Sequence, residues 1–456
     1  MILLPSRYNY SCRISDKYSF INNILTGAID IIENDIWNLT ADNKFELIEN
    51  IPLSNLIERG YFYDNLKKED HIFSELYKNY MKKATTRPVR LVFCPTYECN
   101  LRCTYCFEKD LLSCSNEHMD ETMLDAAIDS AEKISKDFSG EIKSIEFFGG
   151  EPLLNKNKFL INKILGFAES KGSTITVVTN GTNAGNFIDI FKPLSEKVDM
   201  FQITIDGVGE IHDKRRRYAS GKGSFDKISK SIDALLLNGL NTNIRVNIDN
   251  SNIEHLPELF DYVKSKKWLD SPNFNIKPSI VADHSSLEYN EFIIPEEELL
   301  RKLISVYDKY PELEELFGFY IFKPLRHVLE IVYGAPNASP KFFNCESNII
   351  ELNVFCPDGY IYVCPESIGK KEYSIGRFYP DLVFYEDKKN MWSKRDIFSI
   401  EKCRNCRFAP ICGGGCSYSS MLIYKNNTEP VCQRFKETLD VFLKLRGEKI
   451  LKKFLN

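Results

Sequence analysis

This sequence lacks the features that would place a protein in a membrane, outside the cell or on nucleic acid. No apolar run approaches the roughly 18 residues of a membrane helix. The N-terminus has no basic segment followed by an apolar stretch, so we expect no secretory signal and a cytoplasmic protein. A net charge of −5 over 456 residues gives nucleic-acid binding no support. Internal repeats and low-complexity tracts are also missing.

Cysteine, by contrast, is plentiful. The chain carries 14 cysteines, and in a cytoplasmic protein these indicate metal binding or catalysis rather than disulfides. The hydrophobic content of 43% is sufficient for large buried cores. The length predicts roughly two to four domains.

Residues 86–280 alternate strand-like and helix-like segments, which predicts βαβ units, a parallel sheet and the α/β class. Helical periodicity is clear over 119–131 and 160–168. The apolar, β-rich runs are Val89–Phe93, Ile142–Phe148, Thr174–Val178, Met200–Ile205, Asn243–Ile248 and Phe274–Ile280. Functional sites in such folds gather at the carboxyl ends of the strands.

Three cysteines, Cys99, Cys103 and Cys106, directly follow the first of these strands. Three thiolates at this spacing can hold three corners of a [4Fe-4S] cluster, which usually takes four cysteine ligands, so one iron stays open to a small molecule. Zinc is the alternative. Zinc sites usually pair a CxxC with a second CxxC or with histidine, whereas the nearest histidine here is His118 and no second CxxC is near.

The run from Cys99 to Cys106, with Tyr105 before its last cysteine, resembles the CxxxCxxC signature of the radical SAM superfamily. The resemblance implies a partial (β/α)6 barrel, similar to a TIM barrel, whose cluster binds the amino and carboxylate groups of S-adenosylmethionine. It further implies that an electron from the cluster cleaves the sulfonium, and that the 5′-deoxyadenosyl radical abstracts hydrogen from a substrate. The protein then binds and orients these groups.

Motifs at the next three strand ends also resemble the family. Gly149-Gly150-Glu151-Pro152 matches a motif whose backbone contacts the methionine amino group, and glycine allows that close approach. Thr179-Asn180 and Thr204-Ile205-Asp206-Gly207 resemble segments near the ribose or carboxylate, although Asp206-Gly207 also suits an ordinary turn. The resemblance implies a cofactor-binding set of Tyr105, Gly149, Gly150, Glu151, Thr179, Asn180, Thr204, Asp206 and Arg216. Arg216 could equally belong to a solvated basic face, and no general acid or base stands out.

A second cysteine array lies in residues 341–456. Its seven cysteines resemble the pattern of the SPASM domain, which implies two auxiliary [4Fe-4S] clusters and three clusters in all. The resemblance assigns Cys345, Cys364 and Cys416 to the first and Cys403, Cys406, Cys412 and Cys432 to the second. The CxxC pair alone could hold zinc.

Cys356 lies between two ligands of the first auxiliary set. It is either the fourth ligand of that cluster, which we include in the metal set, or a small buried side chain that leaves one iron open to a substrate thiolate. We expect Cys12, Cys94 and Cys114 to be free thiols.

Residues 1–85 resemble the small winged-helix-like α+β module that recognises precursor peptides in many peptide-modifying enzymes. A strand over 26–32, two helices and the ending at 56–62 carry this resemblance, and a purely structural extension is the alternative. An exposed strand edge of the module would bind a leader peptide by adding a strand. Residues 281–340 indicate a helical connector.

Together these resemblances predict a radical SAM peptide maturase that crosslinks a ribosomally made precursor, most simply through a cysteine thioether. We expect two partners, the precursor peptide and a reductant such as flavodoxin or ferredoxin. The alternatives are carbon–carbon crosslinking, a formylglycine-forming activity similar to the anaerobic sulfatase maturases, and a non-catalytic iron–sulfur or zinc protein.

Overall fold

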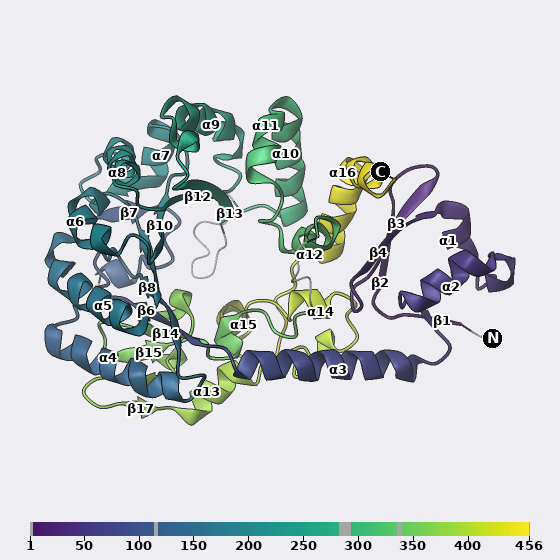
Figure 1. The fold of residues 1–456 in the computed structure, drawn as a ribbon, viewed down its shortest axis with the longest axis horizontal. Coiled ribbons are helices and arrows are strands. Elements are labelled where there is room, and N and C mark those ends of the chain that lie inside the picture. The colour runs from purple at the N-terminus through teal and green to yellow at the C-terminus, as the bar shows by residue number, and fades with distance from the viewer. Residues whose placement is uncertain (1–2, 114–116, 282–292, 335–339, 456) are drawn as a thin grey trace.

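The computed structural model describes residues 3–113, 117–281, 293–334 and 340–455, which form a mixed α/β protein with three regions (Figure 1). An N-terminal sheet and its helices lie at one end, a curved sheet lined by helices lies at the other, and helix α3 (Leu66–Thr85) joins them. Within these ranges no helix is both long and apolar enough to cross a membrane.

Six parallel strands form the curved sheet, adjacent to one another in chain order. They are β6 (Val89–Phe93), β8 (Ile142–Phe147), β9 (Thr174–Thr179), β10 (Val198–Thr204), β12 (Thr242–Ile248) and β13 (Phe274–Ile280). Their positions agree with the expected strands to within two residues, so the α/β class with a parallel, TIM-like sheet is confirmed.

Helices between the strands cover the outer face of this sheet (Figure 1). They are α4 (Glu121–Lys136), α5 (Lys158–Lys171), α6 (Ile188–Phe191), α7 (Glu210–Arg215), α8 (Phe225–Leu237) and α9 (Leu256–Ser265). The first begins where the sequence indicates, because the Asp120 carboxylate accepts a hydrogen bond from the Met123 backbone N–H at 2.8 Å.

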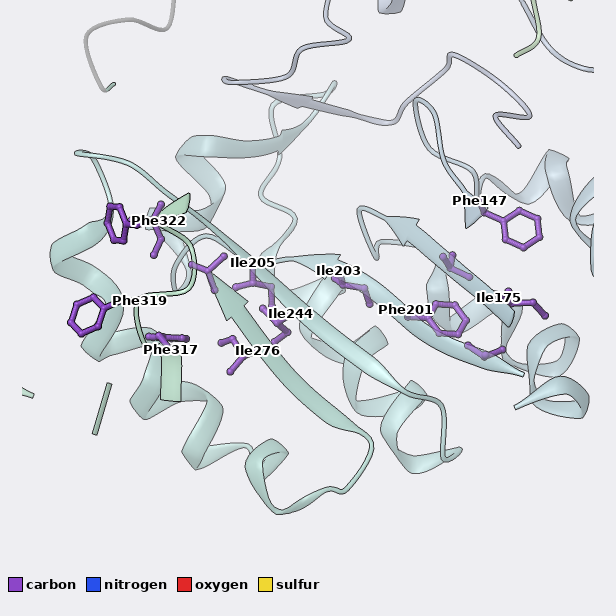
Figure 2. Packing of buried hydrophobic residues seen from close by; sticks show 14 of the residues in the cluster. Phe147, Ile175, Phe201, Ile203, Ile205, Ile244, Ile276, Phe317, Phe319 and Phe322 are labelled. Carbon is purple, nitrogen blue, oxygen red and sulfur yellow. The ribbon is translucent and has the colours of Figure 1, made fainter. Parts of the chain in front are cut away.

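The core runs between the strands and their helices. Figure 2 shows Ile203 of β10, Ile244 of β12 and Ile276 of β13 following one another across the sheet, with Phe201 of β10 closer to Ile175 of β9, all buried. Burial of this much apolar surface is the main favourable term in folding. Aromatic side chains that follow α11 (Pro311–Phe317) close the end of the core next to β13 (Figure 2).

The C-terminal domain extends the same sheet. Strand β14 (Leu352–Phe355) pairs in parallel with β6, and β15 (Tyr360–Tyr362), β16 (Gly376–Arg377) and β17 (Val383–Phe384) follow it antiparallel. The result is one ten-stranded sheet among the described residues. Its helices are α13 (Glu386–Ser393), α14 (Ala409–Cys412), α15 (Ser417–Tyr424) and α16 (Phe435–Leu455). The domain boundary that the sequence indicates at residue 341 therefore separates two segments whose strands belong to the same sheet.

The N-terminal region contains a three-stranded antiparallel sheet in the order β2-β3-β4. The strands are β2 (Asn9–Arg13), β3 (Tyr18–Asn23) and β4 (Ala28–Glu33), with α1 (Asn34–Ala41) and α2 (Asn50–Glu58) after them. A small ribbon pairs β1 (Leu4–Pro5) with β5 (Phe62–Tyr63). The sequence indicated β4 and the two helices but not β2 or β3, whose polar residues hide the pattern.

The described part of the connector holds three helices: α10 (Glu296–Lys309), α11 and α12 (Lys323–Val332). Helices α10 and α12 pack on α16, and α12 also contacts β4. The connector therefore touches both the N-terminal sheet and the C-terminal domain.

Candidate active site

The loop after β6 brings three thiols together. The thiol of Cys99 lies near those of Cys103 and Cys106, and Cys103 sits on the short strand β7 (Leu101–Cys103). That strand pairs with β11 (Arg216–Tyr218), which places Arg216 opposite Cys103. Burial raises the pKa of all three thiols, to about 12 for Cys106. An iron cluster would favour their thiolate forms, which are the metal ligands.

Two glycines let the end of β8 pack against this loop. A Cβ on Gly149 would lie 2.1 Å from the Cys94 sulfur, and one on Gly150 would lie 2.3 Å from the backbone oxygens of Tyr97 and Glu98. Gly149 also has φ +104°, a conformation that side chains disfavour. The glycines predicted to contact the cofactor are therefore required for this backbone approach.

The buried carboxylate of Glu151 ties two strand ends together. It accepts hydrogen bonds from Thr179 Oγ1 at 2.6 Å, the Asn180 backbone N–H at 2.7 Å and the Leu153 backbone N–H at 2.8 Å. The Asn180 side chain in turn reaches Cys99 Sγ at 3.6 Å. Glu151, Thr179 and Asn180 thus form one network that borders the cysteine loop.

A second network surrounds Tyr105. Its hydroxyl donates to the carboxylate of Asp206 and accepts hydrogen bonds from Arg216 Nη1 at 2.8 Å and Asn247 Nδ2 at 3.1 Å. The other Asp206 oxygen accepts from the Asn247 backbone N–H at 2.9 Å. Three residues of the predicted cofactor-binding set therefore meet, whereas Thr204 only reaches the same edge, at the half-buried end of β10.

Sequence reasoning missed Arg215, Asn247 and Asp249 in this network. Arg215 forms a buried ion pair with Asp249 at 2.8 Å and also reaches Asp206 at 3.3 Å. Only Arg215 had a usable signal, because it stands next to Arg216 in the basic run.

Buried polar atoms beside the thiols have no hydrogen-bond partner among the described residues. These are Nε of Arg216 and Oε1 of Glu108, two residues after Cys106. Burial, with Glu151 and Glu366 nearby, raises the pKa of Glu108 to about 8. Orphaned polar atoms and a thiol triplet fit a site that holds a cluster and a polar cofactor.

In the described part of the chain no His, Cys, Asp or Glu group converges on a single metal ion. A cluster does not require this, because each cysteine binds its own iron.

The second cysteine array also gathers in space. The thiol of Cys364 lies near those of Cys345 and Cys416. The remaining four thiols, those of Cys403, Cys406, Cys412 and Cys432, form another group. These are the two sets that the resemblance assigns, so the donors fit two thiolate-ligated clusters.

Cys356 is placed elsewhere. Its fully buried thiol is in hydrogen-bond contact with the thiol of Cys94, near Tyr97 and Asp358. The pairing of β14 with β6 explains this, since the Cys94 backbone N–H donates to the Phe355 oxygen at 2.9 Å. This neighbourhood does not favour Cys356 as a ligand of the first auxiliary set. Cys12 is buried, and Cys114 lies outside the described residues.

Comparisons with known proteins point to the class of enzyme. The model of the Radical SAM superfamily matches residues 93–263. A cysteine-type anaerobic sulfatase-maturating enzyme of Clostridium novyi is 27% identical over 366 residues, 74% of this chain and 90% of that protein. The radical SAM cyclopropyl synthase TigE of Paramaledivibacter caminithermalis is 24% identical over 451 residues, 91% of this chain and 89% of TigE.

Solved structures share the fold. Native anSMEcpe with bound AdoMet and Cp18Cys peptide has a TM-score of 0.60 at 20% identity, over 81% of this chain and 99% of that one. Streptococcus suis SuiB bound to precursor peptide SuiA has a TM-score of 0.54 at 16% identity, over 94% of this chain and 98% of that one. Residues 93–263 therefore form a radical SAM domain, and the protein is an enzyme.

Proposed function

We propose that this enzyme matures a ribosomally made precursor peptide by linking a cysteine sulfur to a carbon of the same peptide. The main support for a thioether is the position of Cys356, whose thiol contacts the thiol of Cys94. It leaves three thiols, those of Cys345, Cys364 and Cys416, in the first auxiliary set. A cluster held by three cysteines has one iron position for another ligand, and a cysteine thiolate of the precursor suits it.

The N-terminal region supports a peptide substrate. In the described residues, strand β4 pairs with no strand other than β3, which leaves its other edge for an added strand, and the Ile29 oxygen of β4 accepts a hydrogen bond from Arg59 Nη2 at 3.2 Å. A groove of about 730 Å³ beside β4 is lined by Asp30 of the strand and by Asn55, Glu58 and Arg59 at the end of α2. We propose that the leader binds there, while the core of the precursor reaches the barrel.

Three [4Fe-4S] clusters and S-adenosylmethionine, when bound, supply sulfonium cleavage, hydrogen abstraction and uptake of the electron left when the carbon–sulfur bond closes. The chain's own residues fix the geometry. Cys99, Cys103 and Cys106 would hold the first cluster, and the Glu151 network fixes the strand ends that border these cysteines. Arg216 presents a buried Nε close to the same thiols, with no hydrogen-bond partner in the described part of the chain, where a cofactor carboxylate could accept its hydrogen bond.

Formylglycine formation is the second candidate, because sulfatase-maturating enzymes are among the relatives that match most of their length. In that reaction a cysteine of a protein substrate loses its sulfur and becomes an aldehyde. The leader-binding groove has no part in it, so the two candidates differ in their need for residues 1–85.

The test uses the anaerobically reconstituted enzyme with S-adenosylmethionine, dithionite and a candidate cysteine-bearing precursor, followed by mass spectrometry. A thioether predicts loss of two hydrogen atoms and loss of one thiol that iodoacetamide can alkylate. A carbon–carbon crosslink loses the same two hydrogens but keeps every thiol. An aldehyde in place of the cysteine thiol would establish formylglycine formation instead. The triple variant Cys99→Ala, Cys103→Ala, Cys106→Ala should leave the peptide unchanged.

A further inference from the structure

A buried arginine lies in the middle of the second cysteine array. Arg395 follows α13 and is only 3% exposed. Its guanidinium donates hydrogen bonds at 2.9–3.4 Å to four backbone oxygens, those of Gly414, Gly415, Asn427 and Glu429. Its Nε is buried with no partner among the described residues. Neither the cysteine motifs nor their spacing indicate this residue.

Arg395 carries a buried positive charge without a carboxylate. Among the described residues no Asp or Glu side chain forms an ion pair with it, and its hydrogen-bond acceptors are all neutral. A guanidinium stays protonated in proteins, so its charge cannot be removed by loss of a proton. An isolated buried charge strongly destabilises the fold unless an opposite charge lies close by. The charge of Arg395 therefore requires anions from another source.

The groups that can supply this negative charge are the cysteines of both auxiliary sets. The side chain lies near the sulfurs of Cys403 and Cys412 from one set and of Cys416 and Cys345 from the other. A Cβ placed on Gly414 would lie 3.8 Å from Arg395 Nη1 and 3.8 Å from Cys403 Sγ, so the guanidinium and this sulfur are at most twice that distance apart.

The segment that joins Cys412 of one set to Cys416 of the other contacts Arg395. Three glycines separate Cys412 of one set from Cys416 of the other, and all three have positive φ, between +69° and +82°. Two of their oxygens, on Gly414 and Gly415, accept hydrogen bonds from the guanidinium. The side chain thus sits where the ligands of the two sets come closest along the sequence.

We infer that Arg395 is the shared counter-charge of the two auxiliary clusters and a positioning residue for the glycine loop between them. This inference rests on the proposed function, because it needs both clusters to be present. Thiolate-ligated clusters are net negative, and reduction adds further negative charge. A nearby buried cation favours the reduced state, since net charge and hydrogen bonding set the reduction potential of a cluster.

The test compares Arg395→Gln with Arg395→Lys in anaerobically reconstituted enzyme, by iron counting and by redox titration followed with electron paramagnetic resonance. Glutamine keeps two N–H donors but removes the charge, whereas lysine keeps the charge and changes the hydrogen bonds. We expect the glutamine variant to lower the equilibrium constant for reduction of each auxiliary cluster about tenfold, a shift of about 59 mV to more negative potential. The lysine variant should stay close to the wild-type potentials.

Arg404→Gln is the matched control. Arg404 follows Cys403 directly but is exposed, so water should screen its charge and its removal should shift the potentials far less. Iron counting distinguishes a failure of the proposed function from a failure of the inference about Arg395. Wild-type enzyme with only about four irons would contradict the auxiliary clusters and thus part of the proposed function. Full iron content with unchanged reduction potentials in Arg395→Gln would overturn only the inference that Arg395 is a counter-charge. The same conclusion would follow if Arg395→Lys shifted the potentials as much as Arg395→Gln.

Discussion

The register of two paired strands decides what surrounds the Cys356 thiol. Because β14 continues the sheet beside β6, residues 356 and 94 directly follow the ends of neighbouring strands and their thiols meet inside an apolar cluster. Spacing along the sequence could not reveal this, since the pairing joins segments more than 250 residues apart. The two sets that the other cysteines form were assigned by the resemblance to the SPASM pattern and not by closeness in sequence, since Cys416 groups with Cys345 and Cys364 although Cys412 is nearer to it along the chain.

The first prediction separates Cys356 from the ligands. Cys356→Ala should retain the wild-type iron content of about twelve per chain after reconstitution, whereas Cys364→Ala should lose up to about four, the content of one cluster. Iron and sulfide assays on the purified variants measure this difference. An equal loss of iron in the two variants would show that Cys356 is the fourth ligand and would remove the support for an open iron position.

The second prediction concerns His212, which is buried between Asp206 and Ser224. Its Nδ1 accepts from the Asp206 backbone N–H at 3.3 Å. Its Nε2 lies 3.1 Å from the Ser224 hydroxyl, whose proton goes to the Arg216 oxygen. This arrangement needs the neutral ring, and burial with Arg216 and Arg215 nearby holds the pKa of His212 well below its usual range.

The unfolded chain binds a proton at this histidine below about pH 6.5, whereas the folded chain does not. The stabilisation is therefore complete above pH 6.5 and falls by up to about 1.4 kcal/mol for each pH unit below it. Urea unfolding at several pH values between 7 and 5.5 should show a shallower acid slope for His212→Asn than for wild type, even if the variant is less stable throughout. The control His71→Asn changes an exposed histidine of α3 and should keep the wild-type slope.

At the scale of elements, the sequence was informative wherever side chains alternate along one strand or helix. All six parallel strands and the start of α4 could be predicted. In β9 and β10, for example, buried residues alternate with half-buried or exposed ones along the strand. Strands β2 and β3 were missed, since Asn9, Asn22 and Asn23 interrupt the apolar pattern. In the structure these asparagines hold turns and ribbons together, as when the Asn23 side chain donates to the Gly60 oxygen at 2.6 Å.

The third prediction tests the turn at the end of β8. Gly150→Ala places a methyl group 2.3 Å from two backbone oxygens of the cysteine loop, so the loop must move away from β8. We expect loss of up to about four irons per chain, those of the cluster at Cys99, Cys103 and Cys106, and loss of S-adenosylmethionine cleavage. Gly166→Ala is the control, because a methyl group there meets nothing within 4 Å inside helix α5. A Gly150→Ala enzyme with full iron content would show that this close approach is not required.

Contacts at the scale of the whole molecule join the first residues of the chain to the last. Tyr10 of β2 donates to Asp440 of α16 at 2.7 Å, and Tyr77 of α3 donates to Asp396 of the C-terminal domain at 3.0 Å. Phe73 and Tyr77 also stack edge-to-face on Phe342 and Phe398. The N-terminal sheet is therefore anchored to the domain that carries the second cysteine array. A leader held on this sheet would keep a fixed relation to the barrel.

The fourth prediction tests that anchored sheet as the leader site. Asn55 is an exposed residue of α2 that lines the groove beside β4, so Asn55→Trp should fill the groove without disturbing the core. We expect the KM for a full-length precursor to rise about tenfold or more with little change in kcat, because the loss is in binding rather than in chemistry. A peptide that lacks the leader should be processed equally by wild type and variant.

The control for the groove is Asn38→Trp, which adds the same bulk to an exposed asparagine of α1. It should leave both kinetic constants unchanged, so that bulk alone cannot explain the effect. If Asn55→Trp leaves the KM of the full precursor unchanged as well, the leader does not use this groove. Residues 1–85 would then serve to buttress the C-terminal domain, through the contacts of Tyr10 and Tyr77. Formylglycine formation, which needs no leader, would become the better account of the enzyme.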